Sequence, residues 1–135
     1  MLTVLLADDD AILRDMYTMR LTRAGFEVHG VMNGQEAVEE AKQIHPDIIL
    51  LDVMMPKMNG LDALKLIKSD PDTGHIPVVL LTAMVQDLSQ VADVIKSAEK
   101  YLVKSEIIPD QLVKTVQEIL AKKNPPTATV SNSTT

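Results

Sequence analysis

Five short apolar runs occur along the chain, separated by longer segments with a different hydrophobic period. The runs TVLLA, DIILL and PVVLL, which begin at Thr3, Asp47 and Pro77, are almost continuously apolar. Such runs are typical of strands that are buried on both faces of a parallel sheet. Two more polar runs, EVHGV from Glu27 and KYLV from Lys100, complete the set of five predicted strands.

The segments between these runs carry their apolar residues at helical spacing instead. In QDLSQVADVIKSA, residues 86–98, apolar side chains recur at i, i+3, i+4 and i+7 from Leu88, which predicts one buried helix face. A second stripe begins at Leu112 in DQLVKTVQEILAKK, and its final lysines suit the negative end of the helix dipole. We expect Asn33 to cap the start of a helix and Gly25 to end the first helix in a left-handed conformation.

The alternation of strands and helices predicts an α/β fold. It implies one doubly wound parallel sheet of five strands, with right-handed crossovers and helices on both faces. A chain of 135 residues is long enough for one such domain, which we place at residues 1–123. The segment NPPTATVSNSTT, residues 124–135, has the Pro, Ser and Thr content of a flexible or disordered tail.

Composition and charge exclude several classes of function. The net charge of −6 argues against direct nucleic-acid binding, and two Tyr and one Phe provide no stacking platform for single strands. The absence of cysteine excludes disulfides and thiolate catalysis and fits a reducing compartment. No apolar run approaches the roughly 20 residues that span a bilayer, and no signal-peptide pattern is visible. We therefore expect a cytoplasmic protein that does not contact membranes.

Acidic residues follow two of the predicted buried strands. Asp8 and Asp9 come directly after the first strand, and Asp52 comes after the third. In such folds ligands bind beyond the carboxyl ends of the strands, which all lie at one edge of a parallel sheet. The fourth and fifth strands deliver Thr82 and Lys104 to the same edge. The sequence therefore predicts that five polar side chains converge there.

This set of side chains suits the binding and transfer of a phosphoryl group. Clustered carboxylates resist ionisation unless positive charge compensates them, and Mg²⁺ binds one or two carboxylates together with water and phosphate oxygens. A carboxylate beside a metal ion and a lysine can accept a phosphoryl group as an acyl phosphate, which is our interpretation of Asp52. Taken singly, the acids have simpler explanations, such as Asp10 as a helix N-cap. Their joint placement favours a site.

Four motifs carry a family resemblance: VLLADDDAILR, DIILLDVMMPKMNG, PVVLLTA and YLVK. With these motifs in this order and spacing, residues 2 to about 123 resemble the receiver domain of bacterial two-component response regulators. The resemblance implies a single, chemotaxis-regulator-like domain with the flavodoxin-like strand order 2-1-3-4-5. It also implies a signalling switch that is not an enzyme in the ordinary sense and catalyses only its own phosphorylation and dephosphorylation.

The resemblance implies a role for each acidic residue of the predicted cluster. Asp52 would accept a phosphoryl group from the phosphohistidine of a sensor histidine kinase or a phosphotransfer protein. Mg²⁺ would be bound by Asp8, Asp9, Asp52 and the main-chain carbonyl of Met54. The cofactor expected from the sequence is therefore Mg²⁺.

The resemblance further implies how the signal leaves the site. Thr82 and Lys104 would contact the phosphoryl group, and Tyr101 would change rotamer together with Thr82 on activation. The face formed by the fourth helix, the fifth strand and the fifth helix would then control a downstream protein, as a local charge event biases a two-state surface. The sequence does not identify that protein, and we expect a monomer or a weak homodimer.

Several positions differ from, or add to, the family pattern. Ser105 follows the site lysine where the family most often has proline, and Ser97 stands near a position that is usually glycine. A cis bond before a non-proline residue costs about 2.5–4 kcal/mol, so we expect a trans peptide between Lys104 and Ser105. The resemblance implies that Met54 and Met84 occupy positions that flank the path of the attacking water, and we expect both to shield the phosphoryl group.

Two other functions compete with this interpretation. A phosphatase similar to the haloacid dehalogenases also uses a strand-end aspartate with Mg²⁺, and Asp8 and Asp10 form its D-x-D pattern. Ile12, however, stands where those enzymes usually have Thr or Val, and no later acidic pair is visible. The second alternative is a pseudo-receiver that acts only by docking and is never phosphorylated.

Overall fold

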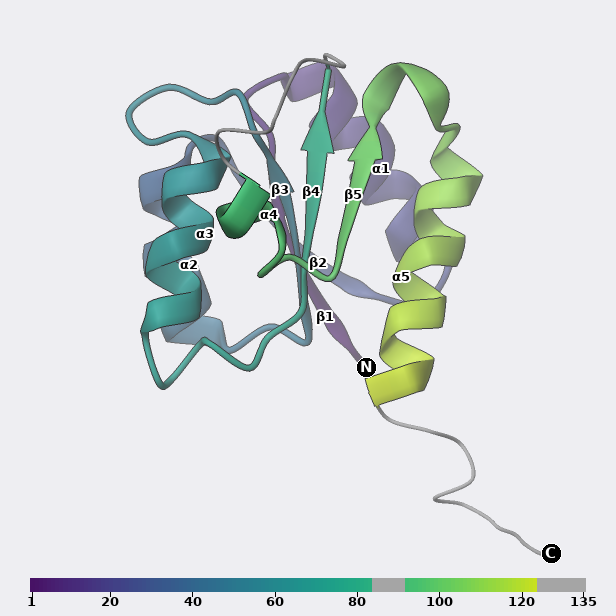
Figure 1. Cartoon of the computed structure of the whole chain (residues 1–135). Coiled ribbons are helices and arrows are strands. Elements are labelled where there is room, and N and C mark those ends of the chain that lie inside the picture. Colours follow the sequence, from purple (N-terminus) through teal and green to yellow (C-terminus); the bar gives the residue numbers. More distant parts are fainter. Residues whose placement is uncertain (84–91, 124–135) are drawn as a thin grey trace, which may run out of the picture.

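A parallel sheet of five strands forms the centre of the computed structural model, which describes residues 1–83 and 92–123 (Figure 1). The strand order is β2-β1-β3-β4-β5, so the predicted flavodoxin-like order is confirmed. All neighbouring strands run parallel. The bounds are β1 Thr3–Ala7, β2 Glu27–Val31, β3 Ile48–Asp52, β4 Val78–Thr82 and β5 Lys100–Val103.

Two strands begin and end one residue later than the apolar runs predicted. β3 excludes Asp47, whose carboxylate accepts a hydrogen bond from the main-chain N–H of Thr3 at 2.8 Å. β4 excludes Pro77, which has no N–H to donate to a neighbouring strand. At their other ends, β3 and β4 include Asp52 and Thr82 as their last residues. These two polar residues therefore stand in the hydrogen-bonded sheet and not in the loops beyond it.

Helices cover both faces of the sheet, as expected (Figure 1). The N-terminal and C-terminal helices, α1 and α5, pack on one face, and α2 and α3 pack on the other. The predicted helix at residues 86–98 falls partly outside the described residues, as does the predicted tail at residues 124–135. The bounds are α1 Ala11–Arg23, α2 Gly34–Ile44, α3 Gly60–Ser69, α4 Ala92–Ile95, the 3₁₀ helix η2 Lys104–Glu106 and α5 Pro109–Lys123.

The strands are buried on both faces because successive side chains alternate between two hydrophobic clusters. In β1, Val4 and Leu6 pack toward α1 and α5, whereas Leu5 and Ala7 pack toward α2 and α3. All four side chains are fully buried. This explains why the sequence of β1 is continuously apolar and does not alternate.

Three helices begin at the carboxyl edge of the sheet with side-chain caps. Asp10, Asn33 and Asn59 each accept hydrogen bonds from main-chain N–H groups in the first turn of α1, α2 and α3. These caps satisfy donors that a helix leaves unpaired and fix the directions of the loops that follow β1, β2 and β3. At the opposite end of α1, Gly25 has φ +99°, as its predicted role in ending the helix requires.

Candidate functional site

The carboxyl edge of the sheet brings the predicted acidic residues together. Asp8 follows β1 and Asp52 ends β3, and the pairing of Ala7 with Leu51 sets the two acids side by side. Carboxylate oxygens of Asp8, Asp9 and Asp52 lie within 4.8 Å of one another. Asp8 and Asp52 are buried, whereas Asp9 is exposed. The predicted convergence of the three acids is therefore confirmed.

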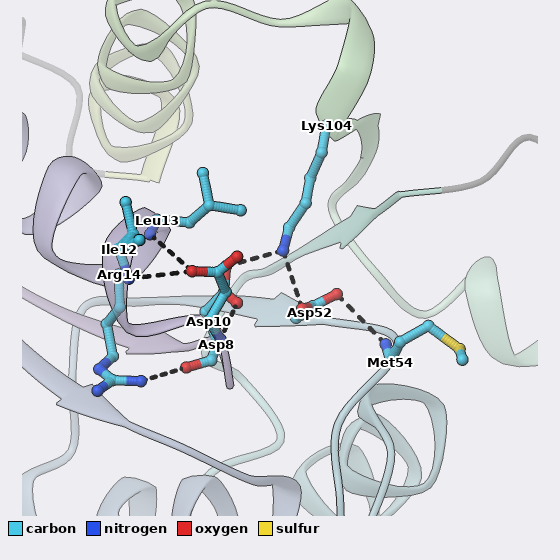
Figure 2. A network of polar contacts seen from close by, with 8 residues as sticks. All are labelled: Asp8, Asp10, Ile12, Leu13, Arg14, Asp52, Met54 and Lys104. Carbon is cyan, nitrogen blue, oxygen red and sulfur yellow. Dashed lines mark hydrogen bonds and ion pairs between the residues drawn. The ribbon is translucent and has the colours of Figure 1, made fainter.

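Lys104 bridges the two buried carboxylates. It follows β5 directly, and its ammonium donates to Asp8 Oδ2 at 2.8 Å and to Asp52 Oδ2 at 2.9 Å (Figure 2). The Lys104 side chain is only 11% exposed, so solvent screens these ion pairs weakly.

The described residues contain no cis peptide bond, which confirms the expected trans peptide between Lys104 and Ser105.

Burial has the largest influence on the ionisation of Asp52. It raises the pKa of Asp52 to about 6, against the hydrogen bond and charge of Lys104, and the charge of Asp8 adds to the rise. The main-chain N–H of Met54 donates to Asp52 Oδ1 at 3.3 Å and acts in the opposite direction. Burial lowers the pKa of Lys104, but its hydrogen bonds to Asp8 and Asp52 outweigh burial and raise that pKa. At neutral pH, a mostly ionised Asp52 therefore lies beside a protonated Lys104.

Two glycines hold the loop that follows Asp52. The N–H of Gly60 donates to the Val53 carbonyl at 2.9 Å, and the N–H of Gly34 donates to the Met58 carbonyl at 2.9 Å. A Cβ at Gly60 would lie 2.1 Å from the main-chain oxygen of Asp52, and one at Gly34 would lie 2.3 Å from that of Met58. Only a residue without a side chain permits such an approach. This packing fixes the direction in which the chain leaves Asp52.

Thr82 and Tyr101 lie on the two strands beyond Asp52. Thr82 is the buried last residue of β4 and is paired by register with Val103, the residue before Lys104. Tyr101 is partly buried and packs on the sheet face that α2 and α3 cover. The structure thus places Thr82 at the edge where the acids converge. Its contact with a phosphoryl group and a rotamer change of Tyr101 stay predictions.

Of the two methionines predicted to shield the site, the structure describes only Met54. Met54 is 63% exposed, and its side chain points away from the Asp52 carboxylate (Figure 2). Met84 lies outside the described residues. Shielding by these side chains, and metal binding by the Met54 carbonyl, therefore stay predictions.

Asp10 does not belong to the acidic cluster. Its carboxylate accepts hydrogen bonds from the N–H groups of Ile12 at 3.0 Å and Leu13 at 3.2 Å (Figure 2). The simple explanation of Asp10 as the N-cap of α1 is confirmed. Because this carboxylate is engaged by the helix, the geometry gives no support to an Asp8–Asp10 pair of the phosphatase type.

Two contacts of the site were not expected from the sequence. Arg14 donates from Nη1 to the main-chain carbonyl of Asp8 at 2.7 Å. The main chain of Gly60 packs directly against the main-chain carbonyl of Asp52. The pair Asn59-Gly60 indicated a turn and a helix start, which the structure shows, but a turn pattern does not reveal what the turn packs against. No local signal points to Arg14, because its partner is a main-chain atom.

The donor set fits a hard divalent cation. Asp8, Asp9 and Asp52 offer oxygen ligands, which Mg²⁺ prefers, and their combined negative charge exceeds the single positive charge of Lys104. A divalent cation held by Asp8, Asp9 and Asp52 would balance the negative charge that Lys104 leaves uncompensated.

The fold and the site together define the class of protein. It is a flavodoxin-like α/β domain with three clustered carboxylates at the carboxyl edge of its sheet, two of them bridged by a lysine.

None of the helices in the described part of the chain is long and apolar enough to cross a bilayer. The cytoplasmic location expected from the sequence stays a prediction.

Comparison with known proteins assigns the family. The family model for the response regulator receiver domain matches residues 4–117, so the chain belongs to this family of two-component signalling proteins. Response regulators interact with histidine kinases and downstream targets, and receiver domains act as signalling switches that bind Mg²⁺ at a cluster of aspartates. The group Asp8, Asp9 and Asp52 is the candidate for that cluster.

Individual relatives agree with this assignment. The chain is 37% identical to the chemotaxis protein CheY of Thermotoga maritima over 118 residues, which are 86% of this chain and 95% of that protein. It is 32% identical to the DNA-binding response regulator MtrA of Mycobacterium tuberculosis, covering 90% of this chain but only 51% of that protein. A solved structure of the Vibrio cholerae chemotaxis protein CheY4 superposes with a TM-score of 0.78 at 31% identity, over 88% of this chain and 98% of that chain.

Proposed function

We propose that this chain is a phosphoacceptor switch that receives a phosphoryl group on Asp52. The donor is the phosphohistidine of a sensor histidine kinase or of a phosphotransfer protein, and the reaction requires Mg²⁺. The phosphorylated form then changes the face formed by α4, β5 and α5 and so controls a downstream protein. The chain acts on no other substrate.

One observation carries this proposal: Asp52 is a buried carboxylate that lies beside two further acids and is paired with Lys104. Asp52 is 3% exposed, lies within 4.8 Å of the oxygens of Asp8 and Asp9, and is held at 2.9 Å by Lys104. For a purely structural strand end, burying two acids and a lysine is costly, because the charges are removed from water. The arrangement is useful when a phosphoryl group and a divalent cation join the same cluster.

The proposed reaction is a displacement at phosphorus. A lone pair of an Asp52 carboxylate oxygen forms the new O–P bond while the P–N bond of the donor breaks, and its electron pair returns to the imidazole, which takes a proton from water. Lys104 then pairs with a phosphoryl oxygen in place of a carboxylate, and the Thr82 hydroxyl donates to a second phosphoryl oxygen. Bound Mg²⁺, held by Asp8, Asp9 and Asp52, would supply positive charge to the phosphoryl oxygens.

The proposed output surface contains a groove close to the site. A groove runs between β5 and α5 and is lined by apolar and polar side chains, among them Tyr101, Leu102, Ile107 and Thr115. It lies beside Lys104, since η2 connects β5 to α5. A shift of Lys104 toward a phosphoryl group would therefore act directly on the chain segment that borders this groove.

The proposal is tested by labelling the protein with acetyl phosphate, a small phosphoryl donor, in the presence of Mg²⁺. We expect the intact mass of the wild type to rise by one phosphoryl group and that of an Asp52→Asn variant to stay unchanged. EDTA should abolish the gain in the wild type. As a matched control, Asp72→Asn removes an exposed carboxylate of the α3–β4 loop and should label like the wild type.

Labelling that survives in Asp52→Asn, or that proceeds fully in EDTA, would contradict the proposal. A wild type that never gains mass would favour the pseudo-receiver alternative, in which the domain works only by docking. Release of phosphate from simple phosphomonoesters, with Asp8 as the labelled residue, would favour the phosphatase alternative.

A further prediction concerns the lifetime of the phosphorylated form. Neither Met54 nor Met84 can orient an attacking water by hydrogen bonding, so we expect slow loss of the phosphoryl group. Introducing polar side chains with Met54→Asn and Met84→Glu should accelerate that loss by roughly one to two orders of magnitude, as positioned polar groups do. Dephosphorylation in saturating Mg²⁺ measures this, with the exposed Met19→Asn on α1 as control. Equal rates in the double variant and the wild type would show that the methionines do not limit access.

A further inference from the structure

The main chain of Asp8 is held as tightly as its side chain. Its N–H donates to the Val31 carbonyl at 3.1 Å, and its Oδ1 accepts a hydrogen bond from the N–H of Asp10 at 3.0 Å. Its Oδ2 accepts from Lys104, and its main-chain carbonyl accepts from Arg14 Nη1 at 2.7 Å. Asp8 is fully buried, so each of these groups depends on its protein partner.

Arg14 approaches this residue from a different side than Lys104 (Figure 2). In addition to the guanidinium contact with Asp8, the main-chain N–H of Arg14 donates to the Asp10 carbonyl at 2.9 Å. Arg14 therefore donates hydrogen bonds to the main chain at both ends of the segment Asp8-Asp9-Asp10. Among the described residues, Arg14 forms no salt bridge with a carboxylate. Although acidic side chains lie nearby, its guanidinium donates to a main-chain oxygen.

A glycine on the neighbouring strand makes room for the Arg14 side chain. A Cβ at Gly30 of β2 would lie 3.2 Å from Arg14 Cδ and 3.5 Å from Cγ, so the aliphatic part of Arg14 crosses the strand where it has no side chain. Gly30 has no backbone conformation that demands glycine. The contact with Arg14 is therefore the feature of this position that a larger residue would disturb.

We propose that Arg14 is a positioning residue of the cation site, which holds the Asp8 main chain so that the carboxylates of Asp8 and Asp9 meet Asp52. This inference rests on the proposed Mg²⁺ site. Removing a residue that hydrogen-bonds to a metal ligand and orients it commonly lowers metal affinity by about 10- to 100-fold. Arg14 acts in this way on a main-chain atom and does not touch the cation.

Charge and positioning predict opposite results, which makes the inference testable. Removing a positive charge beside a cation site strengthens cation binding by electrostatics alone. If Arg14 positions Asp8, removing Arg14 weakens cation binding. The buried carbonyl of Asp8 then loses its hydrogen-bond donor, and the carboxylates of Asp8 and Asp9 are no longer held in place. If Arg14 served only stability, its removal would not weaken cation binding by the molecules that fold.

The test measures the affinity for Mn²⁺ by EPR of the free ion, with Mg²⁺ as the competitor, in the full chain. We expect Arg14→Met to weaken binding by about tenfold. Gly30→Val should weaken it in the same direction while every charge is kept. The control Arg20→Met removes a charge from the same helix at an exposed ion pair with Asp110 and should bind like the wild type.

Urea unfolding of each variant separates folding from binding, and Gly30→Val remains informative if Arg14→Met folds poorly, because valine suits an edge strand. Tighter or unchanged binding by Arg14→Met, or unchanged binding by Gly30→Val, would overturn the positioning role and leave the proposed function intact. A wild type that does not lower the signal of free Mn²⁺, or an Asp52→Asn variant that binds Mn²⁺ as tightly as the wild type, would overturn the proposed cation site and this inference with it.

Discussion

A Gly60→Ala variant should unfold at a clearly lower urea concentration than the wild type, with a loss of about 2–4 kcal/mol in the free energy of unfolding. The added Cβ would lie 2.1 Å from the Asp52 carbonyl oxygen and 3.0 Å from Val53 Cα. Both are main-chain atoms, so no flexible side chain can move aside. The backbone of Asp52 or the start of α3 must shift instead.

The sign of this effect identifies its cause. Gly60 is the first residue of α3 and has no positive φ, so its backbone conformation is open to alanine, which is the better helix former. Without the contact, alanine would be neutral or slightly stabilising. Gly30→Ala is a suitable control, because there the nearest atom is the movable Arg14 Cδ at 3.2 Å. A Gly60→Ala protein as stable as the wild type would show that the loop after Asp52 is not packed as described.

The same substitution should impair phosphoryl transfer among the molecules that do fold. Gly60 lies against the main-chain carbonyl of Asp52, and its N–H donates to the carbonyl of Val53, so a shift at Gly60 moves the main chain that carries the Asp52 carboxylate. We expect slower labelling by acetyl phosphate at a temperature well below the unfolding transition. Labelling at the wild-type rate would mean that the Asp52 side chain is held independently of this loop.

Asp52→Asn should stabilise the protein near pH 7.5, and the gain should disappear in acid. Burial raises the pKa of Asp52 from its ordinary value of 3.8 to about 6 in the folded protein. The folded state therefore binds the proton more tightly than the unfolded state, and ionisation of Asp52 opposes folding. This cost is fully present above pH 6, decreases as the pH falls through 6 toward 3.8, and is absent below.

An asparagine has no charge to bury, so the variant avoids this cost. The two pKa values set an upper bound of about 3 kcal/mol for the gain in the free energy of unfolding at pH 7.5. Lys104 keeps Asp8 as its ionic partner, which limits the loss from the removed charge. Urea unfolding in EDTA at pH 7.5 and at pH 4.5 measures the difference, with Asp72→Asn as control. A variant that is less stable than the wild type at pH 7.5, or a gain that does not change with pH, would contradict this account.

Much of the site was predictable because its residues are tied to strand ends. Asp8, Asp52 and Thr82 end or directly follow a buried apolar strand, and Lys104 directly follows the partly exposed β5. Parallel strands deliver such residues to one edge. The strand order and the convergence of the acids followed from this local information and from the family resemblance. The caps Asp10, Asn33 and Asn59 were equally local, since a short polar side chain at the start of a helical pattern needs only its own helix.

The remaining features depend on contacts between distant segments, which no periodicity records. Strand bounds moved by one residue because Thr3 pairs with the Asp47 side chain and Pro77 lacks an N–H. The pKa of Asp52 follows from how deeply the assembled sheet buries it, and hydrophobic patterning cannot measure that depth. The contacts of Arg14 with Asp8 and of Gly60 with Asp52 involve main-chain carbonyls, whose chemistry is the same at every residue. The sequence by itself therefore determined which side chains reach the carboxyl edge, whereas only the tertiary structure decided how closely the backbone holds them there.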